Sequence, residues 1–324
     1  MENLVLDFLK RHSSIIITTH DIADADGIGA ELVFIQIARH CGIEARIINA
    51  SAVPDNFQFM DPDQIIEQWD KAQDNLPKKA AMVVMDSSDE YHIGKLRDYI
   101  DEASEVFVID HHESNPLAKL KGYMDSSASS TCEIVLEFAF AMGIKLTPST
   151  AKAAYTGIVY DTGFFAYSKT SSRTFKAALT LVETGVNPYE VYRDLNENAS
   201  IGALLLQKTV ISTLEIHNQG KVAVQILRKE DLEQCHASYE DAENFINLPL
   251  KCREIEVSLL IKENREGQTR CSLRSKGAIN VSKIAQTLGG GGHVAAAGFK
   301  SPYGPDETLG IILEKLSKEL NKHD

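Results

Sequence analysis

The chain has 324 residues, 44% of them hydrophobic, which supplies core material for about two domains. Its 46 acidic and 33 basic side chains give a net charge of −13, which disfavours sequence-independent binding of long polyanions. Any nucleic-acid substrate is therefore expected to be short. No apolar run approaches the ~18 residues of a membrane span. Residues 1–12 predict a short amphipathic helix rather than a signal peptide.

The five cysteines are scattered along the chain and never form a CxxC pair. They predict neither a disulfide framework nor a zinc site built on thiolates. A reducing compartment fits this pattern best, so we expect a cytoplasmic protein with no membrane association.

The first half alternates strand-like and helical runs, which is typical of a mostly parallel sheet flanked by helices. Short, β-branched and almost continuously apolar runs predict strands buried on both faces at residues 15–19, 44–50, 80–86 and 105–110. Apolar residues at helical spacing predict a helix over 27–42. A further helix over 129–143 opens with Ser130 and Glu133 in the spacing of a capping box. The region 150–206 is rich in predicted helix, with turns at 169–171 and 185–188.

From about Lys221 the pattern changes to strand candidates interleaved with short helices, at 221–228, 254–263, 269–277 and 280–288, the last of them helical. This pattern predicts a second domain of the α+β class. We therefore expect an α/β domain with a parallel sheet over residues 1–195, a helical linker over 196–212, and a smaller α+β domain over 213–324 on the other side of a cleft.

Polar side chains cluster where three of the predicted strands end. They are His20, Asp24 and Asp26 after the first strand, Asp86 after the third, and Asp110, His111 and His112 after the fourth; Asp161 follows in a later helical segment. In open α/β sheets ligands bind at this edge. Carboxylates gathered so densely raise one another's pKa unless a cation neutralises them. Oxygen ligands with two imidazoles suit two divalent ions such as Mn²⁺ or Mg²⁺, with Zn²⁺ or Co²⁺ as alternatives.

Each of these residues also has a purely structural interpretation. Asp24 and Asp86 could cap helices, His111 and His112 could be core histidines, and Asp161 could belong to a simple turn. Their convergence on one edge of the sheet favours a metal site, because independent caps would not gather there. Gly27 and Gly29 are expected to let the backbone turn tightly between strand and helix.

Six separated motifs carry a resemblance to a known family. They are HDIADADGIG, VVMDSSD, VIDHH followed by SSASSTCEIV, and GIVYDTGFF in the first domain, and SLRSK and GGGGHVAAAGF in the second. With these motifs, in this order and over essentially the whole chain, the protein resembles DHH-family phosphoesterases that carry a DHH-associated C-terminal domain. One position departs from the family pattern, since Ala23 and Ala25 flank Asp24 where the family has proline and glycine.

The resemblance implies a role for each site residue. His20 and Asp24 would bind one metal ion, Asp26, His111 and Asp161 the other, and Asp86 would bridge both. Asp110 would orient a neighbouring group, and His112 would face the scissile phosphate. The two ions would be Mn²⁺, with Mg²⁺ or Co²⁺ as alternatives.

In the second domain, the run of glycines before His293 could be a helix C-cap with a flexible turn, or a backbone that presents several N–H groups to an anion. The resemblance favours the anion site. It implies that Arg274 and His293 hold a phosphate together with Gly290, Gly291 and Gly292, Arg274 offering a planar fork of donors.

Within the family, the chain looks most like the bifunctional oligoribonucleases that also act as pAp phosphatases. The expected substrates are short RNA or dinucleotides and pAp, with no long nucleic acid and no membrane, and a homodimer is left open. The alternatives are a soluble cyclic- or linear-dinucleotide phosphodiesterase, an inorganic pyrophosphatase, and a catalytically idle nucleotide-binding protein.

Overall fold

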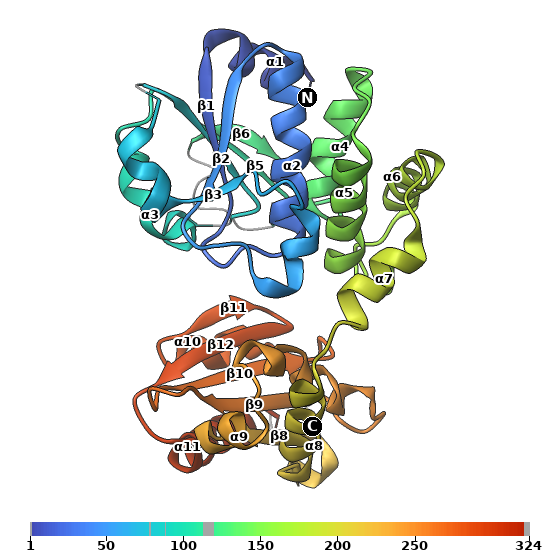
Figure 1. Ribbon diagram of the computed structural model, residues 1–324. Coiled ribbons are helices and arrows are strands. Elements are labelled where there is room, and N and C mark those ends of the chain that lie inside the picture. The colour runs from blue at the N-terminus through green and yellow to red at the C-terminus, as the bar shows by residue number, and fades with distance from the viewer. Residues whose placement is uncertain (1, 78, 88, 113–119, 321–324) are drawn as a thin grey trace. The chain divides into compact units, whose positions relative to one another are not determined.

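The computed structural model describes residues 2–77, 79–87, 89–112 and 120–320. The chain divides into two compact units, Met1–Asn198 and Ala199–Asp324 (Figure 1). None of the described helices is long and apolar enough to cross a membrane.

The first unit is built on a six-stranded parallel sheet with the strand order β3-β2-β1-β4-β5-β6. The strands are β1 (Ser14–Thr18), β2 (Glu44–Asn49), β3 (Ile66–Gln68), β4 (Ala81–Met85), β5 (Val106–Asp110) and β6 (Lys121–Met124). The four predicted strands are confirmed as β1, β2, β4 and β5. The sequence patterns missed β3 and β6, because these short edge strands are only partly buried and lack a continuous apolar run.

Helices cover this sheet on both faces: α1 (Glu2–Arg11), α2 (Ala25–His40), α3 (Trp69–Ala72), α4 (Thr131–Ala141) and α5 (Pro148–Asp161). Helices α6 (Ser172–Glu183) and α7 (Pro188–Asn196) pack against α5. Alternate residues of β1 serve opposite faces. Ile15 and Ile17 join the core formed with α1, α2, α4 and α5, whereas Ile16 joins a second core containing Tyr99 and Trp69. The almost continuous apolar character of the strands therefore follows from burial on two sides.

Small residues bring α2, α4 and α5 into close contact. A Cβ atom at Gly29 of α2 would lie 2.6 Å from Cys132 Sγ and 2.8 Å from the Ala153 carbonyl oxygen, and one at Gly157 of α5 would lie 2.9 Å from the Ala25 carbonyl oxygen. The expectation that Gly27 and Gly29 serve a tight turn was wrong. Both lie inside α2, where they give room to neighbouring elements.

The second unit has a mixed six-stranded sheet with the order β11-β12-β10-β9-β8-β7. The strands are β7 (Glu215–His217), β8 (Val222–Leu227), β9 (Val257–Glu263), β10 (Thr269–Ser275), β11 (Gly291–His293) and β12 (Ala296–Ser301). Only β8 and β9 pair in parallel, and the other neighbours are antiparallel. The expected α+β class of this half is confirmed.

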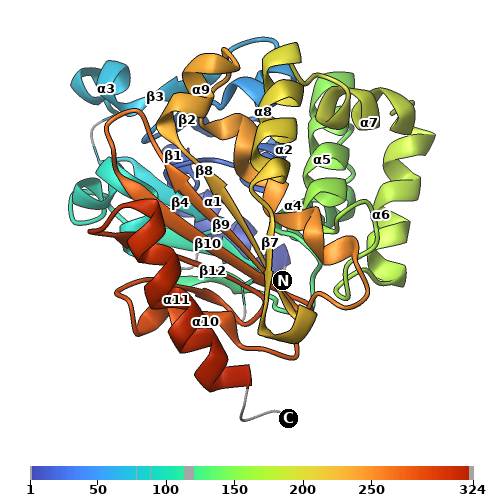
Figure 2. The same cartoon turned by 90° about the horizontal axis from the view of Figure 1, so that it is seen from below.

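Helices flank both faces of the second sheet as well (Figure 2): α8 (Ile201–Ser212), α9 (Lys229–Gln234), α10 (Val281–Gln286) and α11 (Pro305–Leu320). Helices α10 and α11 share one apolar core with the strands. Leu206 and Val210 of α8 pack with Leu227 and Leu232 in a separate core. The segment 196–212, expected as a linker, thus contains a helix that packs within the second unit.

Candidate active site at the strand ends of the first unit

The site lies at the carboxyl ends of β1, β4 and β5. These strands are neighbours in the sheet, and the chain passes from one side of β1 to the other between β3 and β4. His20 follows β1, Asp86 follows β4, and His111 and His112 follow β5. Neighbouring strands lie roughly 5 Å apart, so these side chains meet at the point in the sheet where α/β folds bind ligands.

One group of candidate ligands comprises His20, Asp24 and Asp86. Their ligand atoms all lie within 4.8 Å of one another. His20 Nε2 is 3.6 Å from Asp24 Oδ1 and 3.7 Å from Asp86 Oδ2. Asp24 also caps α2, since its side chain accepts hydrogen bonds from the backbone N–H groups of Asp26 and Gly27. Asp24 is therefore both the N-cap of α2 and a member of the acidic cluster.

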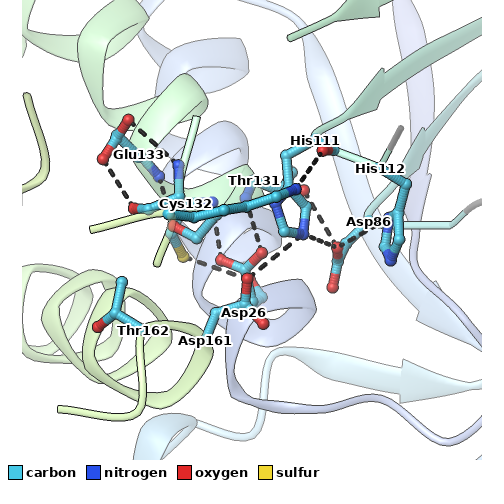
Figure 3. Close-up of polar contacts among 12 residues, drawn as sticks. Asp26, Asp86, His111, His112, Thr131, Cys132, Glu133, Asp161 and Thr162 are labelled. Atoms are coloured by element: carbon cyan, nitrogen blue, oxygen red, sulfur yellow. Dashed lines mark hydrogen bonds and ion pairs between the residues drawn. The ribbon is translucent and has the colours of Figure 1, made fainter. Parts of the chain in front are cut away.

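A second group comprises Asp26, His111 and Asp161, again with ligand atoms within 4.8 Å of one another. Asp26 comes from the first turn of α2 and Asp161 from the last turn of α5. His111 Nε2 lies 3.4 Å from Asp161 Oδ2 and 3.5 Å from Asp86 Oδ1, and Figure 3 shows its ring between these two carboxylates. The close packing of α2 on α5 thus brings together acids from distant parts of the sequence.

Asp86 connects the two groups. Its Oδ2 faces His20, whereas its Oδ1 faces His111, so the two oxygens point toward different sets of ligands. The residue has a φ of +49°, in the left-handed region that aspartate and asparagine tolerate better than most residues. The backbone turn at the end of β4 is therefore compatible with the side chain that the cluster requires.

Burial and mutual repulsion make this cluster electrostatically unfavourable without a cation. Burial first, and then the charge of Asp24, raise the pKa of Asp86 to about 7. Burial followed by the charge of Asp86 likewise raises the pKa of Asp26 and of Asp161. Burial and then the charge of His112 lower the pKa of His111 to about 4, which leaves its imidazole neutral and able to bind a metal at pH 7.

Buried and half-buried oxygen donors and a neutral imidazole, in two groups that Asp86 connects through its contacts with His20 and His111, fit a pair of divalent ions. Thiolates take no part, because the pKa of the nearby Cys132 is raised far above neutrality, first by burial and then by the charge of Asp26.

The amino end of α4 holds Asp26 in place, a feature that sequence patterns did not predict. Asp26 Oδ2 accepts a hydrogen bond from Thr131 N at 2.6 Å, and Oδ1 accepts one from Cys132 N at 2.8 Å (Figure 3). Thr131 Oγ1 also donates to Asp86 Oδ1 at 3.2 Å. The positive end of the helix dipole therefore faces two acids of the site.

The predicted capping box at α4 is only half formed. Ser130 accepts from the Glu133 backbone N–H as expected, but the Glu133 carboxylate accepts from Ser129, with Ser129 Oγ at 2.8 Å. The serine-rich run before α4 thus fixes the start of the helix whose N–H groups hold Asp26.

His112 and Asp110 form a hydrogen-bonded pair, and with Asp86 and His111 they make a third group whose candidate ligand atoms lie within 4.8 Å of one another. Asp110 is fully buried, and its Oδ1 lies 2.6 Å from His112 Nδ1 while also accepting from the His111 backbone N–H at 2.8 Å. Burial alone would lower the pKa of His112, but the hydrogen bond with Asp110 raises it overall. Asp110 thereby orients the ring and favours its protonated form.

Ala23 and Ala25, which depart from the family motif, are both buried. Neither has a positive φ, so the loop around Asp24 needs no glycine at these two positions.

In the second unit, Arg274 lies on β10 and His293 on β11, and both pair with Ala296 of β12. They therefore occupy one row across three strands, although the side chain of His293 lies outside what the structure describes. Two of the three predicted substrate glycines have packing reasons as well. A Cβ at Gly290 would lie 2.8 Å from Phe299 Cα, and one at Gly292 would lie 2.6 Å from Ala297 Cα, whereas Gly291 faces open space.

Comparison with known proteins identifies the family. Residues 14–158 match the DHH family, N-terminal domain, and residues 207–322 match the DHHA1 domain. The chain belongs to the DHH family. It is therefore a metal-dependent phosphoesterase, a hydrolase whose divalent metal ions are held by clustered histidines and aspartates, and the resemblance noted in the sequence is confirmed.

Three related proteins are informative. A bifunctional oligoribonuclease and PAP phosphatase from Thermus thermophilus is 29% identical over 321 residues, covering 98% of this chain and 94% of that protein. A cyclic-di-AMP phosphodiesterase from Geobacillus thermodenitrificans is 31% identical over 198 residues, 60% of this chain and 28% of that protein. The crystal structure of an exopolyphosphatase-related protein from Bacteroides fragilis superposes with a TM-score of 0.91 at 25% identity, covering 98% of this chain and 95% of that one.

Proposed function

We propose that this DHH phosphoesterase hydrolyses short oligoribonucleotides to mononucleotides and removes the 3′-phosphate of pAp. The observation that carries the proposal is the pair of ligand groups connected by Asp86, in a chain related over nearly its full length to an oligoribonuclease and PAP phosphatase. The net charge of −13 supports short substrates, since long polyanions need an extended basic surface. A cytoplasmic location belongs to the same proposal, whereas a homodimer stays open.

The metal ligands in this proposal are those that the structure brings together in two groups. His20 and Asp24 would hold one ion, Asp26, His111 and Asp161 the other, and Asp86 would be shared. Oxygen and imidazole donors favour Mn²⁺, with Mg²⁺ or Co²⁺ as alternatives. Bound ions would supply activation of a water molecule and neutralise charge on the phosphoryl oxygens.

His112 supplies the positive charge that the protein itself brings to the scissile phosphate. The 2.6 Å contact of its Nδ1 with Asp110 orients the ring, and Nε2 is the atom that would donate to a substrate oxygen. Against the effect of burial, the hydrogen bond with Asp110 raises the pKa of His112, which favours the protonated form of the ring. Asp110 acts through His112 and is a positioning residue.

The second unit supplies the substrate-binding groups in this proposal. Arg274 offers a bidentate fork to a phosphate, and His293 lies in the same row of the sheet. Gly291 adds a backbone with no side chain in front of it, while Gly290 and Gly292 shape the strand that carries it.

The experiment is a substrate panel with added Mn²⁺: pAp, a 5′-phosphorylated RNA dinucleotide, a longer RNA, cyclic di-AMP and pyrophosphate. Released mononucleotide or phosphate is measured. Fast release from pAp and the dinucleotide is the expected result, and Asp86→Ala, which removes the shared ligand, should abolish it. Activity confined to long RNA or pyrophosphate would refute the substrate assignment.

The similarity to a cyclic-di-AMP phosphodiesterase favours a second candidate, a cyclic- or linear-dinucleotide phosphodiesterase. Turnover of cyclic di-AMP with little activity on pAp would select it. If no phosphate ester is hydrolysed with Mn²⁺, the idle nucleotide-binding alternative replaces both.

A further inference from the structure

An exposed aromatic ring, that of Tyr167, lies on the loop that follows Asp161, one of the proposed metal ligands. Tyr167 is 60% exposed. A Cβ atom at Gly163, two residues after Asp161, would overlap the Tyr167 ring. One face of the ring therefore rests on the Gly163 backbone, and its exposure leaves the other face open to solvent.

The backbone of this loop adopts an uncommon conformation that keeps the ring in place. Gly163, Phe164 and Phe165 have φ values of +54°, +56° and +66°, and for the two phenylalanines this costs about 1–2 kcal/mol each. Thr162 compensates with several hydrogen bonds. Its Oγ1 accepts from Phe165 N at 3.1 Å, and its carbonyl oxygen accepts from Tyr167 N at 2.9 Å.

A positive charge lies at the end of the same loop. Lys169 Nζ donates to the carbonyl oxygen of His111 at 3.2 Å, which anchors the ammonium group next to a proposed metal ligand. Its charge also acts on Asp161. Burial and the neighbouring acids raise the pKa of Asp161, and the charge of Lys169 lowers it. An open aromatic face and an ammonium group thus lie two residues apart on the loop that follows Asp161, and the ammonium group contacts the backbone of His111.

We propose that Tyr167 is a stacking platform for a nucleobase of the substrate and that Lys169 binds a phosphate of the same nucleotide. The subsite rests on the proposed function, because only a nucleotide substrate presents a flat base and an anionic group together. Stacking tolerates any base, since every base has a π-face. The subsite therefore favours nucleotides over other phosphate esters without selecting a sequence.

The test compares two substrates on the full-length protein with Mn²⁺: the 5′-phosphorylated dinucleotide pApA and its doubly abasic analogue with the same sugar-phosphate backbone. Loss of stacking on one base corresponds to roughly 5- to 150-fold in kcat/KM. Tyr167→Leu should lower kcat/KM for pApA by this factor, mostly through KM, and change it less than about twofold for the abasic analogue. Tyr167→Phe retains an aromatic ring and should have the same kcat/KM for pApA as the unsubstituted protein.

Tyr189→Leu is the matched control, since Tyr189 is a 62% exposed tyrosine at the start of α7 in the same unit. It should leave both substrates unaffected. Lys169→Gln keeps a donor for the His111 carbonyl but removes the charge, and should slow both substrates alike. Circular dichroism melts check that each variant is folded.

Equal losses on the two substrates in Tyr167→Leu, or no loss on either, would overturn the stacking platform while leaving the proposed function intact. An unchanged kcat/KM in Lys169→Gln would remove Lys169 from the subsite. If the unsubstituted protein hydrolysed neither dinucleotide, the proposed function itself would fail, and the subsite with it.

Discussion

Replacing Asp86 with asparagine removes one charge from the centre of the acidic cluster while preserving the shape of the side chain. Asparagine tolerates the φ of +49° at this position, so the backbone should not be strained. In the folded protein the pKa of Asp86 is raised from 3.8 to about 7, first by burial and then by Asp24. The full rise corresponds to about 4 kcal/mol of lost stability, at ~1.4 kcal/mol for each pH unit.

The pH range of this loss follows from the direction of the shift. Below pH 3.8 the carboxyl group is protonated in both states and costs nothing. As the pH rises toward 7, the unfolded chain ionises first and the folded state is progressively destabilised; above pH 7 the loss is complete. Because neighbouring acids share the repulsion, we expect Asp86→Asn to stabilise the metal-free protein by about 2–4 kcal/mol at pH 8 and by almost nothing at pH 4.

Urea denaturation in excess chelator measures this difference. The single tryptophan, Trp69, lies in the first unit, so its fluorescence reports the unfolding of the unit that contains the site. Asp101→Asn, at an exposed position, is the control and should change stability by less than about 0.5 kcal/mol. Adding Mn²⁺ should reverse the order, since two bound ions, each at 100 times its Kd, stabilise the unsubstituted protein by about 5.4 kcal/mol in total and the variant far less.

The reasoning would be refuted if Asp86→Asn were less stable than the unsubstituted protein at pH 8 in chelator. The same holds if its effect were equal at pH 4 and pH 8, because the loss would then not come from ionisation of the cluster.

Three further changes test other parts of the structure. Gly29→Ala should destabilise the first unit by about 1–3 kcal/mol in thermal melts, since the added Cβ would lie 2.6 Å from Cys132 Sγ. The control is Gly310→Ala, in open space on α11, which should be neutral or stabilising. Equal effects of the two substitutions would contradict the packing argument. Burial alone would raise the pKa of Glu105, but hydrogen bonds with three basic side chains lower it from 4.5 to about 2. Glu105→Gln should therefore lower the free energy of unfolding by about 1–2 kcal/mol at pH 7, measured by urea denaturation. The stabilisation by the Glu105 carboxylate is complete above pH 4.5 and is lost as the pH falls toward 2. If the variant were still less stable than the unsubstituted protein at pH 2, the stabilisation would not come from this ionised carboxylate. Arg274→Ala should raise KM for an RNA dinucleotide by roughly 10- to 150-fold and leave a minimal activated phosphodiester almost unchanged; equal losses in steady-state kinetics would remove Arg274 from substrate binding.

The sequence by itself determined the central strands and the residues at their ends. Strands β1, β4 and β5 are buried on both faces, so each appears as a continuous apolar run that stops at a polar residue. Parallel strands deliver these ends to one edge of the sheet, which is why His20, Asp86 and His111 could be grouped before any coordinates were known. Edge strands such as β3 are only partly buried, so their sequences contain no continuous apolar run that would predict them.

Tertiary structure alone decided how the ligands are held. Asp26 accepts hydrogen bonds from the backbone of Thr131 and Cys132, more than 100 residues further along the chain. Lys169 reaches the His111 carbonyl across 58 residues of sequence. Local periodicity records which face of a strand or helix is buried, but it carries no information about which distant backbone group a side chain will meet. That pairing is set by the close packing of α2 against α4 and α5, and the acids of the site depend on it.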